Sequence, residues 1–160
     1  MQGFDQHHHD LTLSILARSA ELSLATIRAD GSPHASTVNF ASDGLLLYAA
    51  ISIDSHKAHD IHLHPQVALT VTAPYRDWHQ IQGLSIDANA SMIGEPLETA
   101  RASELLLAKF PQFAEVIANP TVLPWPGMLF IRITPRVINV LDYTKHFGNQ
   151  QSFEVDAAAA

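Results

Sequence analysis

The residues best placed for chemistry are Ser55, His56 and Lys57, at the predicted start of a helix that follows Asp54. The stretch after them loses strand alternation, contains no glycine and ends before Pro65, which is typical of a helix capped by Asp54 or Ser55. Free backbone N–H groups at a helix start attract anions, and Lys57 adds a positive charge beside them. The pattern therefore predicts a site for a phosphate group. The alternative is that Ser55 only caps the helix and that Lys57 is a solvated side chain.

The same helix is rich in histidine. His56, His59 and His62 are spaced three residues apart and lie roughly along one side, so that a divalent metal site is conceivable. Such sites usually add a carboxylate or an i, i+4 pair, and Asp60 lies off that side. We therefore expect no metal and a solvated helix face, from which a protonated His56 adds a donor for an anion.

No catalytic nucleophile can be named from the sequence. The chain has no cysteine, which excludes disulfides, thiolate catalysis, iron–sulfur clusters and zinc-thiolate sites. Serines are numerous, but no G-x-S-x-G motif presents one of them on a sharp turn. The catalytic residues stay unidentified at this point.

Seven segments carry the alternation or the apolar run of β-strands. In chain order they are 22–28, 33–40, 45–53, 66–73, 78–93, 128–133 and 136–141. The first two are predicted to form a hairpin, and the third is expected to join them in a meander. The fifth is long enough to be one bent strand with a bulge at Gly83. The last two are predicted to pair as a hairpin around Thr134 and Pro135.

Four segments are predicted to be helical, and they are 10–19, 54–64, 97–110 and 112–118. Residues 119–127 hold three prolines and must form a connection. Residues 1–9, with three histidines, and the residues from about 149 to 160 are expected to be polar tails. The whole chain, 1–160, is predicted to be one domain. Its antiparallel strands favour a small closed barrel over a sandwich, because closure removes exposed strand edges.

Composition excludes several classes of partner. The net charge of −7 disfavours both nucleic acid and an anionic membrane surface. No apolar stretch approaches the ~20 residues of a membrane span, and the polar N-terminus does not have the order of a signal peptide. We therefore expect a cytoplasmic protein. Because 47% of the residues are hydrophobic and only 16% are charged, part of the surface is expected to be buried in at least a dimer.

An ordered set of short motifs suggests a family. Along the chain stand Asp-Gly-Ser-Pro-His (30–34), Leu-Leu-Leu-Tyr-Ala-Ala (45–50), Ser-His-Lys (55–57) and His-Pro-Gln-Val-Ala-Leu-Thr-Val (64–71). In this order and spacing, roughly residues 10–95 resemble the pyridoxamine 5′-phosphate oxidase-like family. The resemblance implies an FMN-binding split β-barrel of α+β class, with about seven antiparallel strands and three to four short helices. It also implies a homodimer with the cofactor at the subunit interface.

The resemblance implies a set of FMN-binding residues. It places the second strand along the isoalloxazine ring, so that the residues beside the ring are Ala35, Ser36, Thr37, Val38 and Asn39. Alternation turns 35, 37 and 39 to one face and 36 and 38 to the other. The residues implied on the phosphate side are Ser52, Ser55, His56 and Lys57. Family members often have threonine where this chain has Ile51 and a second basic residue where it has His56.

The fifth strand is the part of the chain that the partner subunit of such dimers often lends to the flavin. Gln80 and Gln82 are predicted to share one face of this strand and to hydrogen-bond the ring edge, with a solvent-facing role as the alternative. Trp78 is predicted to be a core or interface residue.

The resemblance implies an FMN-dependent oxidoreductase that passes electrons between a reduced nicotinamide and an unidentified small molecule. The pyridoxamine oxidases end in a substrate-binding Arg-x-His segment that this chain does not have, so the chain resembles an uncharacterised branch. Lys145 and His146 near the C-terminus are hypothesised to orient the substrate. Two alternatives stay open, namely a deazaflavin-dependent reductase and a module that binds flavin or haem without turnover.

Overall fold

The computed structural model describes residues 2–156 of the chain. Its helices are α1 (Gln6–Arg18), α2 (His56–Leu63), α3 (Pro96–Lys109) and α4 (Phe113–Val116), with a short 3-10 helix, η1 (Trp78–Gln80). Its strands are β1 (Gln2–Gly3), β2 (Glu21–Ile27), β3 (Pro33–Asn39), β4 (Ala41–Asp43), β5 (Leu46–Ser52), β6 (Gln66–Thr72), β7 (Gln82–Met92), β8 (Met128–Asp142) and β9 (Gln150–Glu154).

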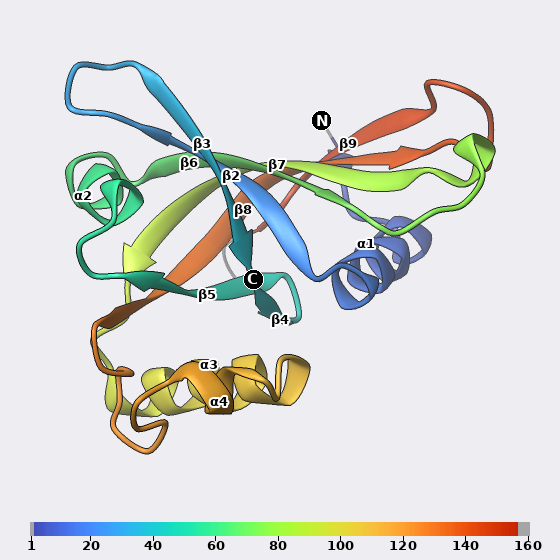
Figure 1. Cartoon of the computed structure of the whole chain (residues 1–160). Coiled ribbons are helices and arrows are strands. Elements are labelled where there is room, and N and C mark those ends of the chain that lie inside the picture. The colour runs from blue at the N-terminus through green and yellow to red at the C-terminus, as the bar shows by residue number, and fades with distance from the viewer. Residues whose placement is uncertain (1, 157–160) are drawn as a thin grey trace.

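The strands form one curled sheet in the order β1-β9-β8-β7-β6-β2-β3, and β5 pairs with both β4 and β8. All the pairings are antiparallel except that of β1 with β9. Figure 1 shows the strands crossing one another steeply, with α1 below one end of the sheet, α2 beside the other end and α3 with α4 beneath β5. The molecule is a split β-barrel with four α-helices, which confirms the predicted fold class.

The first hairpin is confirmed, but the predicted meander is wrong. β2 and β3 pair in register from Glu21 with Asn39 to Ile27 with Pro33. The next long strand, β5, does not pair with β3; it pairs instead with the first half of β8, from Leu47 with Ile133 to Ser52 with Met128. The strand edge between β3 and β5 therefore stays open, and this is where the barrel is split.

The predicted last hairpin is also wrong, because β8 runs through Pro135 as one strand. The register between β7 and β8 shifts between Asp87 and Ala88, and Ala88 lies opposite Pro135. The irregularity accommodates the proline, since proline has no N–H to give to the ladder. The extra residue of this bulge is Arg136 in β8, so the bulge predicted in the fifth strand at Gly83 is not found there. Gly83 is needed for another reason, since a Cβ there would lie 2.9 Å from the carbonyl oxygen of Val71.

Both expected tails contain regular structure. α1 begins at Gln6, because the Asp5 carboxylate caps it by accepting from the His8 amide at 2.9 Å. The three N-terminal histidines therefore lie in a helix. At the other end β9 pairs with β8. Residue 1 and residues 157–160, which are also part of the expected tails, lie outside the described residues.

The core has two parts. The larger one fills the concave side of the sheet and includes Ile15 and Leu16 of α1 and Ile61 of α2. The smaller one joins α3 to β5 and β8 through Leu106, Trp125 and neighbouring aromatic side chains. Among the described residues, no helix has the length and apolar character needed to span a membrane.

Candidate functional site

One cavity, of about 460 Å³, lies at the open edge between β3 and β5. β3, the end of β5 and the start of α2 form one wall, which we call the polar wall. The segment from α4 to the start of β8 forms the other, the apolar wall. The lining residues are Thr37, Val38, Asn39, Ala50, Ile51, Ser52, Lys57, Phe113, Val116, Ile117, Ala118, Trp125, Pro126 and Met128.

The polar wall contains several residues that the sequence singled out. Thr37, Val38, Asn39, Ser52 and Lys57 all line the cavity, although they come from three separate elements. The predicted alternation of β3 is present, since its odd-numbered positions are exposed and its even-numbered positions are turned inward. Two predicted residues of the same strand, Ala35 and Ser36, lie outside the cavity lining, and the hydroxyl of Ser36 is buried without a hydrogen-bond partner.

The start of α2 offers hydrogen-bond donors. Ser55 is the N-cap, and its hydroxyl accepts from the Ala58 amide at 3.2 Å and donates to the Ser52 carbonyl at 2.7 Å. The amides of His56 and Lys57, the first two helical residues, have no partner within the helix, as at any helix start. Lys57 lines the cavity, whereas the His56 side chain is exposed beside it. The cavity therefore has one cation at this end, in the first turn of a helix whose first two amides are not paired within the helix.

A buried carboxylate anchors α2 to the sheet. Asp60 is only 3% exposed, and it accepts a hydrogen bond from the Thr26 hydroxyl of β2 at 2.8 Å. Nδ1 of His34 on β3 lies 3.7 Å from the same carboxylate. These contacts fix the helix start relative to β2 and β3. On the same helix, His59 and His62 are exposed, and no described residues form a cluster that could hold a metal ion.

The apolar wall was missed by sequence reasoning, which treated 119–127 only as a connection. Trp125 is 2% exposed and packs edge-to-face against Phe130 and Phe113, with ring centroids 4.8 and 5.8 Å away. The Trp125 indole N–H has no acceptor among the described residues, and an unpaired buried donor costs about 1–3 kcal/mol. The available signal was an aromatic residue placed between two prolines.

Gln80 and Gln82 lie at the other end of β7 from the cavity. Gln80 belongs to η1, so the two do not share one face of a strand as predicted. The side chain of Gln82 accepts from Arg18 at 2.8 Å and donates to Asp142 at 3.1 Å. Burial raises the pKa of Asp142, but hydrogen bonds from Thr144 and Gln82 outweigh burial and hold this pKa below its usual value.

Three other residues that the sequence singled out are also outside the lining. Lys145 and His146 are exposed in the turn between β8 and β9. Trp78 is 48% exposed, which excludes a core position. Its ring stacks on Phe147 of the same turn at a centroid distance of 5.0 Å.

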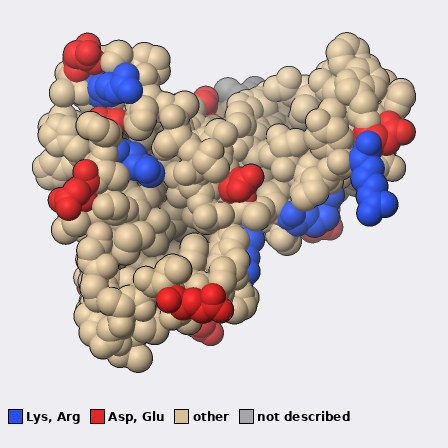
Figure 2. All heavy atoms as spheres, viewed as in Figure 1, with Lys and Arg blue, Asp and Glu red and all other residues tan. Residues whose placement is uncertain are grey.

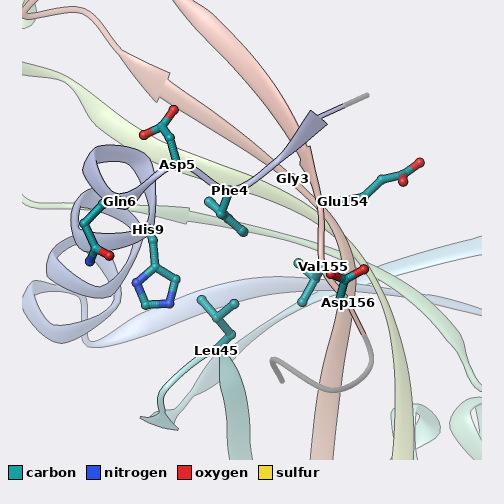
Figure 3. A pocket seen from close by; sticks show the side chains of 9 residues that line it. All are labelled: Gly3, Phe4, Asp5, Gln6, His9, Leu45, Glu154, Val155 and Asp156. Atoms are coloured by element: carbon teal, nitrogen blue, oxygen red, sulfur yellow. The ribbon is translucent and has the colours of Figure 1, made fainter.

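A second cavity, of about 370 Å³, lies between the start of α1 and the end of β9. Figure 3 shows that its labelled residues come from the N-terminal strand and helix, the turn before β5 and the last strand. Asp5, Glu154 and Asp156 line it. The hydrogen bond from the His8 amide, together with a second from the His8 side chain, lowers the pKa of Asp5. Three carboxylates repel a phosphate, so the cavity beside α2 is the candidate site for an anionic ligand.

Comparison with known proteins identifies a family and several solved structures with the same fold. The family model described as pyridoxamine 5′-phosphate oxidase matches residues 11–141. Among curated proteins, no match to the chain was found.

Solved structures with the same fold differ widely in sequence. A haem-binding protein from Mycobacterium smegmatis is 15% identical with a TM-score of 0.79, and the match covers 98% of this chain and 61% of that one. General stress protein 26 from Bacillus anthracis is 20% identical with a TM-score of 0.68, covering 94% and 100%. The haem storage protein HutZ from Vibrio cholerae is 18% identical with a TM-score of 0.64, covering 89% and 91%. Identities this low show a shared fold only.

Proposed function

The chain belongs to the pyridoxamine 5′-phosphate oxidase family, and from this premise we propose that it is an FMN-binding oxidoreductase. Its reaction passes electrons between a reduced nicotinamide and a small organic substrate. FMN lies in the cavity beside α2, at the interface of a homodimer.

The observation that carries the proposal is the distribution of polarity around this cavity. One end holds Lys57, in the first turn of α2, and the opposite wall is made of Phe113, Trp125 and Met128. FMN has the same division, with a doubly charged phosphate at one end and a planar ring at the other. A phosphate at a helix start gains charge-assisted hydrogen bonds, which are about twice as strong as neutral ones.

Each wall has a definite part in holding FMN. Lys57 and the amides of His56 and Lys57 bind the phosphate, and the side chains of Thr37 and Asn39 donate to the polar edge of the ring. The rings of Phe113 and Trp125 and the side chain of Met128 give the isoalloxazine ring an apolar surface to lie against. When bound, FMN supplies the electron transfer itself, so the chain needs no nucleophile of its own.

Absorbance spectroscopy with titration of FMN tests the proposal. Wild-type protein is expected to bind FMN and to oxidise NADH faster when FMN is supplied. We expect Lys57→Ala to weaken FMN binding about tenfold or more, because one charge-assisted contact is lost. Arg136→Ala is the matched control, since Arg136 is exposed and outside the cavity lining. Equal FMN affinity in wild type and Lys57→Ala would remove the phosphate assignment.

Haem is a second candidate, because two of the similar structures are of haem-binding and haem storage proteins. None of the described residues that line the cavity is a histidine, and Met128 is the one lining side chain with a soft donor atom. A histidine ligand would therefore have to come from outside this lining. A Soret band after haem titration, with no uptake of FMN, would favour this candidate, and uptake of a deazaflavin in preference to FMN would favour the related reductase.

A further inference from the structure

We propose that FMN is itself the small organic substrate of the proposed reaction, which enters the cavity oxidised and leaves it reduced, and that it is not a resident prosthetic group. This role of FMN rests on the proposed function and deepens it by naming the molecule that accepts the electrons. The cavity offers the phosphate too few contacts to retain it.

The phosphate end of the cavity holds one cation. Lys57 is the one charged residue in the lining. The two stretches that form the walls, 33–57 and 113–128, contain no other lysine or arginine. Asp54 is exposed and stands three residues before Lys57, so its carboxylate opposes the attraction of a dianion to the helix start. The lysine charge is therefore offset locally, in a chain whose net charge is already −7.

The hydroxyl group of the helix cap is already in use. Ser55 has a single O–H, which donates to the Ser52 carbonyl at 2.7 Å, while its oxygen caps the Ala58 amide at 3.2 Å. Ile51, which lies beside Ser52 in the lining, has no polar side-chain atom. At this end of the described lining, the Ser52 hydroxyl is therefore the neutral side-chain donor that remains beside Lys57.

Few contacts to the phosphate imply weak binding. One charge-assisted contact changes affinity about tenfold or more. A dianion that meets one cation rather than several is therefore expected to bind with a Kd of about 1 μM or weaker. At an association rate of about 10⁶ M⁻¹s⁻¹, such a ligand leaves about once per second. This rate is within about tenfold of a typical turnover number, and weaker binding makes exchange faster.

The cavity is also open to solvent in the described chain. Thr37, Asn39 and Ser52 line it and are exposed at the same time. On the other wall, Val116 lines the cavity and is 80% exposed. A ligand can therefore reach and leave this chain's part of the site without movement of the backbone.

The reaction balances without a group on the protein that stores electrons. A reduced nicotinamide transfers a hydride to FMN, water supplies one proton, and the products are oxidised nicotinamide and reduced FMN. The proton comes from solvent because the described lining contains no aspartate, glutamate or histidine. The product must then be consumed by a reaction that takes electrons from free reduced flavin. Reduction of ferric iron is of this class, since one reduced flavin reduces two ferric ions and releases two protons.

An anaerobic dialysis cell tests whether electrons leave with the flavin. The protein and NADH are placed on one side and ferricytochrome c on the other, across a membrane that passes FMN but neither protein. We expect cytochrome c to be reduced, as measured by absorbance, at a rate that rises with added FMN and exceeds that of a cell without the protein. Cytochrome c that is reduced no faster than in that control, while the protein binds FMN, overturns the inference.

A variant with a second cation gives an independent reading. His56→Arg adds a long cationic side chain at the exposed first residue of α2, beside Lys57. We expect it to tighten FMN binding about tenfold, because a charge-assisted contact is added, and to leave the affinity for riboflavin, which has no phosphate, unchanged. His62→Arg is the matched control, since it adds the same charge at an exposed position in the last turn of the same helix.

Flavin fluorescence titration and gel filtration of the FMN-saturated protein measure affinity and exchange. Wild type is expected to bind FMN reversibly and to lose it on the column. FMN that stays with wild type through the column, or a Kd in the nanomolar range, overturns the inference and leaves the proposed function. Equal tightening by His62→Arg overturns the account of a site short of phosphate contacts. No FMN binding at any concentration removes the proposed function, and the inference with it.

Discussion

The two walls of the candidate cavity differ in how the chain builds them. The polar wall comes from 37–57, a nearly continuous stretch in which a hairpin, a strand end and a helix cap follow one another. The apolar wall comes from 113–128 and owes its position to packing against Phe130 and α3. The difference indicates separate roles. In the proposed function the polar wall provides hydrogen bonds to an anion, and the apolar wall fixes the shape of the cavity and contributes to stability.

The two cavities also differ in the charges that line them. Figure 2 shows a face on which charged side chains are few and scattered among neutral ones. Lys57 is the one charged residue in the lining of the candidate cavity, whereas the second cavity has three carboxylates. A single cation in uncharged surroundings is weakly screened by other protein charges, so its effect on a phosphate is large.

The largest expected effect on stability comes from a substitution in the apolar wall. Trp125→Ala removes a fully buried ring from between Phe113 and Phe130, and we expect it to lower the free energy of unfolding by about 3–5 kcal/mol. Trp125→Phe is the control, because it keeps an aromatic ring and removes the N–H that has no partner. Urea denaturation measures both. A loss below about 1 kcal/mol in Trp125→Ala would show that this wall does not contribute to stability.

A smaller effect separates two roles at the polar wall. Ser55→Ala is expected to cost about 1 kcal/mol of stability, because the Ala58 amide loses its cap. Ser55→Asp keeps a capping oxygen but adds a negative charge beside the phosphate position, so it should retain stability and weaken FMN binding. Thermal unfolding and FMN titration on the same samples check this. If Ser55→Ala weakens FMN as much as Lys57→Ala, the hydroxyl contacts the phosphate directly.

What the sequence predicts well is local. The turn before β3 and the start of α2 depend on neighbours within a few residues. The helix, His56–Leu63, lies within the predicted 54–64, and Ser55 is the one of the two predicted caps that the structure uses. The alternation of β3 also follows from the sequence, because a strand has a period of two.

What the sequence does not predict depends on distant partners. Pro135 marks a strand end in most contexts, but here the register with β7 shifts at the neighbouring Arg136 and β8 continues. β5 was assigned to β3 because they are consecutive, whereas the pairing it adopts is with a strand about eighty residues away. Trp125 could not be placed in the cavity because nothing in 119–127 indicates which side packs on Phe130.

A pH-dependent effect contrasts the two partly buried lysines. Lys109 on α3 has its ammonium 3.9 Å from the centre of the Phe40 ring, and burial lowers its pKa from 10.5 to about 8. Between these values the unfolded chain holds a proton that the folded chain has released, so the free energy of unfolding should rise with pH from about 8 to 10.5. Lys109→Met should flatten this rise without changing FMN affinity, whereas Lys57→Ala should change FMN affinity alone. Denaturation at several pH values measures the free energy of unfolding of both proteins. If this free energy rises equally with pH in wild type and Lys109→Met, the lowered pKa of Lys109 is contradicted.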